Sequence, residues 1–270
     1  RGRVSSALRF VLASPAVKAA EVRENNSQDN VGPSLSKPRK AKDILLVMAA
    51  TPKSSSIRFL GWLLSKLWRR LLDKIVVDET GIELVRKAVE DGASICYVPC
   101  HQSHLDYLLM SYVCFAYSLP VPHIAAGNNL AIAGLSTLLR TSGAFFIKRS
   151  FKSDRLYSEV FRAYIRGLVH NKLCTAFFVE GGRSRTGKLL PAKLGVLGAL
   201  CDSIRSDDGE GALSGNGKDS KGWNGDVVLV PISFNYSAIA EEWTVVRELN
   251  GVPKQKESLF SLFRTLCRML

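Results

Sequence analysis

The chain has 270 residues, of which 46% are apolar, enough for the core of one α/β domain of about 200 residues with an extension. Its 37 Lys and Arg against 24 Asp and Glu leave a formal charge of +13, which favours an anionic membrane surface, a polyanion or a phosphorylated substrate as partner. The cysteines contain no C-x-x-C pair, which argues against a zinc site or a disulfide framework and for a reducing compartment. We interpret them as small buried side chains: Cys96, Cys100, Cys114, Cys174, Cys201 and Cys267.

Residues 1–56 are predicted to be mostly a flexible linker or extension. The segment 25–30 is polar, the segment 37–40 is basic, and only 44–50 has the character of a short ordered piece. The chain begins at Arg1 without a methionine and stops in an apolar segment, so we expect it to be a fragment of a longer protein.

Residues 57–76 are predicted to form a basic amphipathic helix. Leucines and isoleucines fall on one half of a helical wheel, whereas the cations, among them Arg69 and Arg70, fall on the other half. Such a helix, with tryptophans at its margin, either lies in a membrane interface or docks on the protein core with a solvated basic face. The sequence leaves both possibilities open, but the helix is too charged to span a bilayer.

From residue 80 onward, short apolar runs alternate with longer helical segments. The spacing predicts strands at 94–98, 121–125, 144–147, 175–179 and 227–233, and helices at 80–90, 105–116, 130–140, 155–170 and 194–204. This alternation predicts an α/β fold with a mainly parallel central sheet covered by helices on both faces. We expect an N-terminal helical extension to precede this fold. The Gly-, Ser- and Asp-rich segment 206–226 interrupts the pattern, and we interpret it as a disordered surface insertion.

The segment 97–106, Y-V-P-C-H-Q-S-H-L-D, ends a buried strand and opens a helix. In open α/β sheets the reactive crevice lies at that end of the strands. If His101 lies in the turn and Asp106 in the first helical turn, the carboxylate holds one imidazole nitrogen and leaves the other to accept a proton from a substrate hydroxyl. Ser103 and Asp106 also resemble a capping box, in which Asp106 only closes the helix start. The motif alone leaves both roles open.

Polar residues follow two further predicted strands. They are Lys148, Arg149, Glu180, Gly181, Gly182, Arg183 and Arg185. Arginine forks and a lysine point charge at one sheet edge suit a phosphate monoester, and glycines permit close backbone approach. We interpret Glu180 as a brace that pairs with and orients the arginines, rather than as a second acid or base. The glycines match neither a P-loop nor the Rossmann spacing, and no G-x-S-x-G elbow is present.

Four blocks in this order resemble the motifs of the glycerolipid acyltransferases. They are H-x4-D at 101–106, G-x-F-F-I-x-R at 143–149, F-V-E-G-G-R-S-R at 178–185 and V-P-I at 230–232. Within that superfamily the chain is most similar to the membrane-bound glycerol-3-phosphate acyltransferases of bacterial and mitochondrial type, with the dihydroxyacetone-phosphate acyltransferases close behind. The resemblance covers 77–270, which we take as an acyltransferase domain that lacks the C-terminal region of fuller-length relatives.

The resemblance implies that His101 is the general base and Asp106 its orienting partner. It places the acceptor's phosphate on Lys148, Arg149, Arg183 and Arg185, with Glu180, Gly181, Gly182 and Pro231 in supporting roles. The glycines are candidates to donate backbone N–H groups to an oxyanion. The implied donor is acyl-CoA or acyl-carrier protein, and the implied acceptor is glycerol 3-phosphate or dihydroxyacetone phosphate. Because a thioester is already activated, we expect no metal and no cofactor.

The predicted function is transfer of a long-chain acyl group to the sn-1 hydroxyl of glycerol 3-phosphate, which gives lysophosphatidic acid in the first step of glycerophospholipid synthesis. The alternative within the family is a dihydroxyacetone-phosphate acyltransferase of ether-lipid synthesis. The alternatives outside it are a non-catalytic membrane-surface protein and a nucleic-acid-binding module. We expect no nucleic-acid partner, because the key cations follow buried strands instead of lining an exposed face. A membrane-associated protein is expected, with its site facing a reducing compartment, and the sequence does not identify the organelle.

Overall fold

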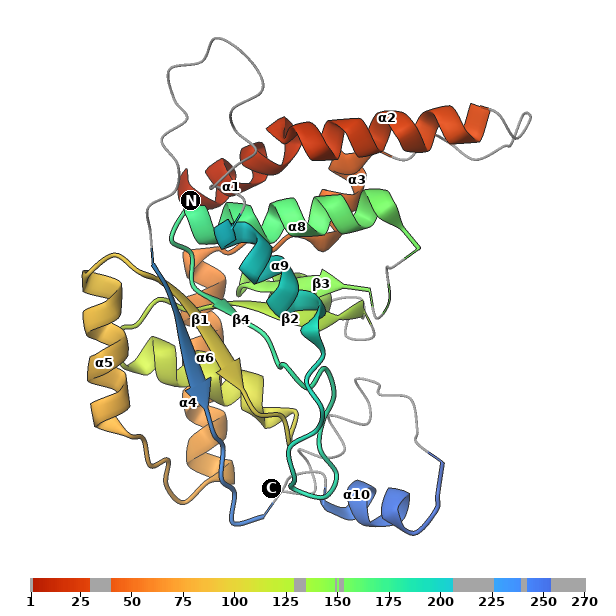
Figure 1. The fold of residues 1–270 in the computed structure, drawn as a ribbon. Helices are drawn as coiled ribbons and strands as arrows, with labels where there is room; N and C mark the ends of the chain where they lie inside the picture. Colours follow the sequence, from red (N-terminus) through yellow and green to blue (C-terminus); the bar gives the residue numbers. More distant parts are fainter. Residues whose placement is uncertain are drawn as a thin grey trace.

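The computed structural model describes residues 2–29, 40–128, 135–148, 150, 153–205, 226–238 and 242–253. Within these residues, five strands form one sheet in the order β3-β2-β4-β1-β5, and every neighbouring pair is parallel (Figure 1). The strands are β1 (Ser94–Pro99), β2 (His123–Gly127), β3 (Ala144–Ile147), β4 (Thr175–Ala176) and β5 (Val227–Ile232). Because parallel strands end at the same edge, the segments that follow them are brought together there.

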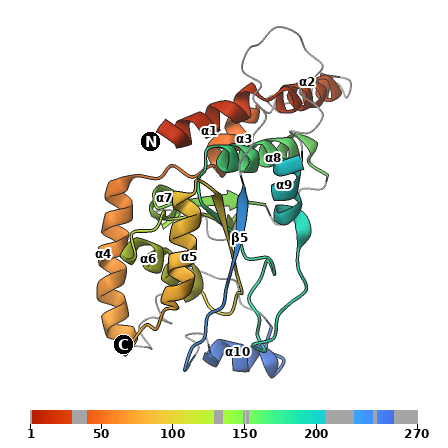
Figure 2. The ribbon, with the colours of Figure 1, turned by 60° about the vertical axis from the view of Figure 1, so that its left-hand side comes forward.

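Helices cover both faces of this sheet. One layer is built around α8 and α9, and the other contains α5 and α6 with α4 outside them (Figure 2). The helices are α1 (Gly2–Ala13), α2 (Pro15–Asp29), α3 (Ala41–Met48), α4 (Ser54–Leu71), α5 (Glu79–Glu90), α6 (Leu105–Ala116), α7 (Leu135–Thr141), α8 (Arg155–His170), α9 (Leu194–Arg205) and α10 (Glu242–Leu249). The predicted α/β fold, with a parallel sheet between two helical layers, is confirmed.

Strand β1 illustrates why the sheet needs two covering layers. Ile95 and Tyr97 belong to the apolar cluster on the α5 and α6 side, whereas Cys96 belongs to the cluster on the α8 and α9 side. Successive side chains of a strand point to opposite faces, so a continuous apolar run is buried only when helices lie on both sides. Helix α8 begins as predicted, since the Asp154 carboxylate accepts the Tyr157 backbone N–H at 3.0 Å.

The N-terminal extension is helical where the structure describes it, which confirms the predicted helical extension and corrects the flexible linker predicted for most of residues 1–56. Helices α1 to α3 pack on α8, and a Cβ added at Gly167 would lie only 3.0 Å from the carbonyl oxygen of Ala7. The buried Tyr164 hydroxyl accepts the Ala50 backbone N–H at 3.1 Å. The contact between α1 and α8 is made by Ala7 and Gly167, small residues that a hydrophobic pattern does not reveal. The polar runs in the sequence, in contrast, are easy to recognise and suggested a linker. Residues 30–39 of that prediction lie outside the described residues.

Most predicted elements of the acyltransferase domain have the expected bounds to within a few residues, and β4 differs most. It has two residues instead of five, because the chain leaves the sheet in a turn in which the Gly181 N–H donates to the Phe178 carbonyl at 2.9 Å. Helix α7 begins at Leu135, and 130–134 of that predicted helix lie outside the described residues. The same holds for 206–225 of the predicted insertion. Helix α10 was not predicted.

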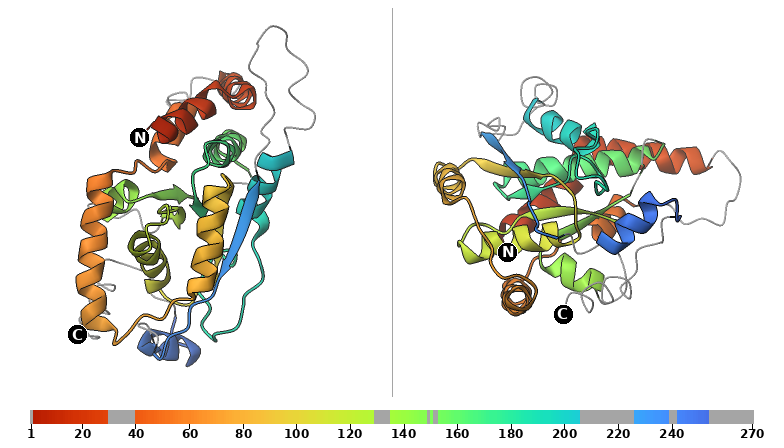
Figure 3. Two further views of the ribbon diagram at one scale, coloured as in Figure 1. Left: turned by 90° about the vertical axis from the view of Figure 1, so that its left-hand side faces the viewer. Right: turned by 90° about the horizontal axis from the view of Figure 1, so that it is seen from below.

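Helix α4 docks on α6, which supports one of the two interpretations of the amphipathic segment (Figure 3). Leu64 and Trp68 are buried in the contact. A Cβ at Gly61 would lie 2.6 Å from the Phe115 ring, so the two helices approach closely at this point. Among the described residues, no helix is both long enough and apolar enough to cross a bilayer.

Candidate active site

The candidate site lies at the carboxyl edge of the sheet, where the segments after β1, β4 and β5 meet. Strand β1 leads to His101, the chain after β4 turns through Glu180, and β5 leads to Tyr236. In Figure 1, β1 and β5 run downward and α10 lies near their ends. The parallel topology therefore gathers residues that are far apart in the sequence, as the strand-end pattern predicted.

His101 and Asp106 form the hydrogen-bonded pair that their spacing predicted. His101 Nδ1 lies 2.9 Å from Asp106 Oδ2, with His101 in the turn after β1 and Asp106 in the first turn of α6. The His101 side chain is 14% exposed, and the Asp106 side chain is 0% exposed. A carboxylate against Nδ1 makes this nitrogen the N–H donor, so Nε2 is the nitrogen that accepts a proton.

Asp106 also closes the start of α6, so it makes both sets of contacts considered for it, to the imidazole and to the helix start. Its Oδ2 accepts the backbone N–H groups of Gln102 at 2.7 Å and Ser103 at 2.9 Å. The Ser103 hydroxyl in turn accepts the Leu105 N–H at 3.1 Å. On the other side of the carboxylate, the Tyr236 hydroxyl donates to Oδ1 at 2.6 Å. A carboxylate buried without donors is costly, and here both oxygens have them.

The segment after β4 holds His101 in place. The Phe178 ring stacks on the imidazole, with the ring centroids 4.0 Å apart and the planes 30° apart. Glu180 Oε1 accepts the His101 backbone N–H at 3.0 Å, and the Ser184 N–H donates to the His101 carbonyl at 2.7 Å. The second Glu180 oxygen accepts the Leu190 N–H at 2.9 Å. Glu180 is thus a brace for the backbone and not for the arginines, because it is buried and backbone N–H groups engage both of its oxygens.

Two of the predicted phosphate-binding cations are paired with carboxylates. Lys148 Nζ lies 2.8 Å from Asp154 Oδ2, the N-cap of α8, and the Lys148 side chain is 42% exposed. Arg185 Nε lies 2.7 Å from Glu248 Oε2 on α10. Its Nη1 is buried, and no hydrogen-bond partner for this nitrogen is found among the described residues.

For the two remaining predicted cations, the structure gives little information about position. Arg183 is half-buried in the same loop as Arg185, and Arg149 lies outside the described residues. The gathering of all four cations around one phosphate therefore stays a prediction. In the described ranges no three His, Cys, Asp or Glu side chains are grouped as a metal site would require.

The two glycines of the loop differ in their surroundings. Gly181 has a φ of +60°, and a Cβ there would lie 2.6 Å from Lys193 Cδ, so a side chain would be strained. Its N–H already donates to the Phe178 carbonyl, which corrects the prediction that it is an oxyanion donor. For Gly182 that role stays a prediction. Pro231 lies opposite Val98 on β5, an edge strand, where a missing N–H is tolerated.

Three buried thiols and one buried imidazole of the sheet region are unsuited to be nucleophile or base. Burial raises the pKa of Cys96 and of Cys114 to about 11 and that of Cys174 to about 12, so these thiols stay protonated at neutral pH. Their burial confirms the interpretation of these three as small buried side chains. The same interpretation was wrong for Cys201, which is exposed, and Cys100 is only partly buried. Burial also lowers the pKa of His123 to about 4, and its Nδ1 lies 3.2 Å from the Cys174 carbonyl oxygen.

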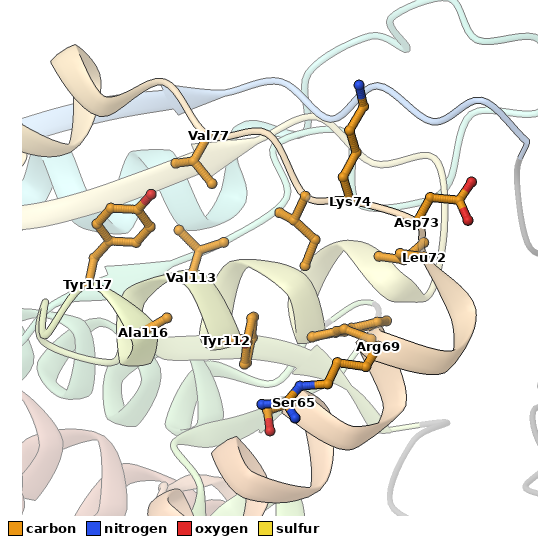
Figure 4. A pocket seen from close by; sticks show the side chains of 12 residues that line it. Ser65, Arg69, Leu72, Asp73, Lys74, Val77, Tyr112, Val113, Ala116 and Tyr117 are labelled. Atoms are coloured by element: carbon orange, nitrogen blue, oxygen red, sulfur yellow. The ribbon is translucent and has the colours of Figure 1, made fainter.

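A groove of about 410 Å³ lies between the end of α4, the segment that follows it and α6 (Figure 4). Val77, Val113 and Tyr117 line it, and Arg69 and Lys74 add positive charge. It runs along the second half of α6, whereas Asp106 is at the start of that helix. The groove is therefore distinct from the candidate active site.

Three residues of the site were missed from the sequence. Tyr236 follows β5 in the stretch S-F-N-Y, and the same strand-end rule that singled out His101 applies to this stretch. Phe178 opens the F-V-E-G-G-R-S-R block, two residues before Glu180, but the sequence pattern indicated no role of its own for it. Glu248 carried no signal, because its helix lies outside the strand-end segments.

A family model described as acyltransferase matches residues 76–235, which is more than half of the chain and includes both members of the dyad. The chain belongs to the acyltransferase family. The matched region begins one residue before the predicted boundary at 77, and the resemblance drawn from the four blocks is confirmed.

Several relatives carry the name glycerol-3-phosphate acyltransferase. That of Glaesserella parasuis is 37% identical over 260 residues, which are 96% of this chain and 30% of the relative. That of Actinobacillus pleuropneumoniae is 36% identical over 260 residues, which are 96% of this chain and 29% of the relative. That of Pseudomonas aeruginosa is 41% identical over 210 residues, which are 78% of this chain and 23% of the relative. The chain thus spans less than a third of the length of the curated relatives it matches.

Proposed function

We propose that this acyltransferase moves a long-chain acyl group from the thioester of acyl-CoA or acyl-carrier protein to the sn-1 hydroxyl of glycerol 3-phosphate, giving lysophosphatidic acid. The observation that carries the proposal is the pair formed by His101 and the buried Asp106, 2.9 Å apart at the carboxyl edge of the sheet. The acceptor is supported by the names of the relatives from Glaesserella parasuis and Pseudomonas aeruginosa.

The chemistry assigned to the dyad is direct transfer. Nε2 of His101 takes the proton of the acceptor hydroxyl as that oxygen attacks the thioester carbonyl carbon. Asp106 stabilises the imidazolium that forms, and the hydrogen bond at Nδ1 keeps the ring oriented. When the tetrahedral intermediate collapses, the carbon–sulfur bond breaks and the imidazolium returns the proton to the leaving thiolate. The step needs no covalent enzyme intermediate, because the acyl group arrives already activated.

The acceptor phosphate is assigned to the basic residues of the second and third motifs. Arg185 is bound to Glu248 and Lys148 to Asp154, so each exchanges a carboxylate for the phosphate when the acceptor binds. A phosphate monoester carries more charge than a carboxylate and offers three oxygens, which favours this exchange. The phosphate then places the hydroxyl at the other end of the acceptor next to His101.

The outward face of α4 is assigned to an anionic membrane surface. Phe59 and Trp62 are 51% and 57% exposed on this face, with ring centroids 6.1 Å apart. The exposed cations Arg58, Lys66 and Arg69 accompany them. Exposed aromatic rings beside cations are typical of helices that lie in a membrane interface. Since the opposite face is packed on α6, the helix can lie on lipid without leaving the protein.

The reaction is tested with the full protein in detergent and labelled palmitoyl-CoA, with glycerol 3-phosphate and dihydroxyacetone phosphate as competing acceptors. The expected product is labelled lysophosphatidic acid, formed faster than the dihydroxyacetone-phosphate ester. Faster transfer to dihydroxyacetone phosphate would reassign the acceptor. No transfer to either acceptor by a folded protein supplied with both acyl-CoA and acyl-carrier-protein donors would refute the proposal.

The membrane surface is tested by sedimentation with phosphatidylcholine vesicles with and without phosphatidylglycerol. Binding to the anionic vesicles is expected, and Phe59→Ser combined with Trp62→Ser should abolish it. Val76→Ser is the matched control, because Val76 is also exposed but lies outside α4. Equal binding by the double variant and the control would rule out this face as the membrane contact.

A further inference from the structure

We infer that Tyr236 is a positioning residue for acyl transfer, which orients Asp106 and through it the imidazole of His101. The inference rests on the proposed function and adds a third residue to the dyad. The Tyr236 hydroxyl donates to Asp106 Oδ1 at 2.6 Å. This distance is typical of a strong hydrogen bond from a hydroxyl to a carboxylate, and Asp106 is fully buried.

The contacts of the two Asp106 oxygens come from different parts of the chain. Oδ2 is engaged by groups of the segment 101–106 itself: the imidazole and the N–H groups of Gln102 and Ser103. Oδ1 is engaged by Tyr236, 130 residues further along the sequence. A carboxylate held through one oxygen can still rotate about its Cβ–Cγ bond. A donor on the second oxygen fixes the carboxylate plane, and with it the direction from which Oδ2 meets Nδ1.

Strand β5 explains how a distant tyrosine reaches this point. It pairs with β1 over its whole length, and the Cys100 N–H donates to the Ile232 carbonyl at 2.9 Å, one residue before His101. Beyond β5 the chain therefore runs beside the turn that carries the base. The Tyr236 ring packs with Leu105 and its apolar neighbours and stacks with Phe234, their centroids 6.4 Å apart. Strand β5, which contains the fourth motif, thus leads the chain to a tyrosine that supplies a hydroxyl to the dyad.

Removal of this hydroxyl has a specific expected consequence. Oδ1 is left buried without its donor, so the carboxylate gains by turning toward another donor and away from Nδ1. The imidazole is then less well oriented when it takes the proton, whereas the residues that hold the substrate are unchanged. The loss therefore falls on kcat and not on KM.

The test compares Tyr236→Phe with Tyr112→Phe, which deletes a hydroxyl from α6, the helix of Asp106, at a position away from the dyad. Tyr236→Phe is expected to lower kcat about 10- to 100-fold with an unchanged KM for glycerol 3-phosphate. Because a buried carboxylate oxygen loses its donor, the melting temperature should fall by a few degrees while unfolding stays cooperative. Tyr112→Phe should match the wild type. In an Asp106→Asn background, Tyr236→Phe should cost nothing further. An unchanged kcat, or the same loss in both backgrounds, would overturn the inference.

A second measurement is independent of turnover. In protein labelled with ¹⁵N-histidine, which has only four histidines, Tyr236→Phe should move the imidazole resonances of His101. Tyr112→Phe should leave them in place, and unchanged His101 resonances in Tyr236→Phe would overturn the inference. If the wild type transfers no acyl group, the proposed function is refuted. The NMR measurement would still show whether Tyr236 orients the imidazole of His101.

Discussion

The two halves of the candidate active site are prepared to different degrees. The dyad is fully assembled: the imidazole is stacked, its Nδ1 is bound, and both oxygens of Asp106 have donors. The cations proposed for the phosphate are instead paired with carboxylates, Lys148 with Asp154 and Arg185 with Glu248. A preorganised base needs no rearrangement in the transition state, whereas these cations must exchange partners first. Under the proposed function, the base is thus assembled before the substrate binds, whereas the anion site is completed by the ligand.

The largest expected effect is the loss of the base. His101→Ala should lower the turnover of acyl transfer by about 10² to 10⁴-fold, because no other group at the dyad can take the hydroxyl proton. The initial rate with labelled palmitoyl-CoA measures it, and an unchanged melting temperature shows that the fold is intact. A rate equal to that of the wild type would mean that the assembled half is not catalytic.

The protein should become less stable at acid pH because of His123, and this limits the pH range in which the two halves can be compared. Burial lowers its folded-state pKa to about 4, against an ordinary value of 6.5, so the unfolded chain takes up this proton first as pH falls. The stability it contributes is fully present above about pH 6.5 and is lost toward pH 4, a difference of about 3 kcal/mol. Urea unfolding at pH 7 and pH 4 measures the decrease, which should be smaller in His123→Gln. An equal decrease in both proteins would contradict this assignment.

Removing the carboxylate that pairs with Arg185 should have a smaller effect, and it should improve the enzyme instead of impairing it. Glu248→Gln removes the competing charge, so the KM for glycerol 3-phosphate should fall about two- to five-fold while kcat stays constant. Glu242→Gln, at an exposed position of the same helix, is the matched control. A raised KM in Glu248→Gln would instead show that Glu248 holds Arg185 ready for the phosphate, and the contrast between the two halves would disappear.

The smallest effect is expected at Lys148, whose ion pair is more exposed. Asp154→Ser removes the charge but keeps a side chain that can cap α8, so the helix should persist. The KM for glycerol 3-phosphate should then fall by less than about two-fold, because solvent weakens an exposed pair. A change larger than that of Glu248→Gln would reverse the ranking of the two cations.

The parts of the site that could be predicted are local or depend on one general rule. The five-residue spacing of His101 and Asp106 allows a single geometry in which a turn residue meets the first helical turn, and the structure has it. The rule that parallel strands end together placed Glu180 near the base correctly. The arginines were the wrong partners for Glu180, because its partners are the backbone N–H groups of His101 and Leu190, which no side-chain pattern reveals.

The parts that could not be predicted depend on distant pairings of common residue types. Tyr236 and Asp106 meet only because β5 lies beside β1. Glu248, which pairs with Arg185, belongs to α10, a helix that the sequence did not predict. The N-terminal helices failed for another reason. Where α1 crosses α8, Ala7 lies close to Gly167, and such small residues give almost no signal in an apolar pattern.

The close contact between Gly61 and Phe115 has a consequence for where the chemistry takes place. A Cβ at Gly61 would lie 2.6 Å from the Phe115 ring, so α4 and α6 meet without room for adjustment. If α4 rests on lipid as proposed, the start of α6 with Asp106 stands at one height above the head groups. The dyad would then meet an acyl donor at one fixed distance from the bilayer. If the acyl chain of the donor remains in the bilayer, the length of that chain would affect how far the thioester extends from the membrane toward the dyad.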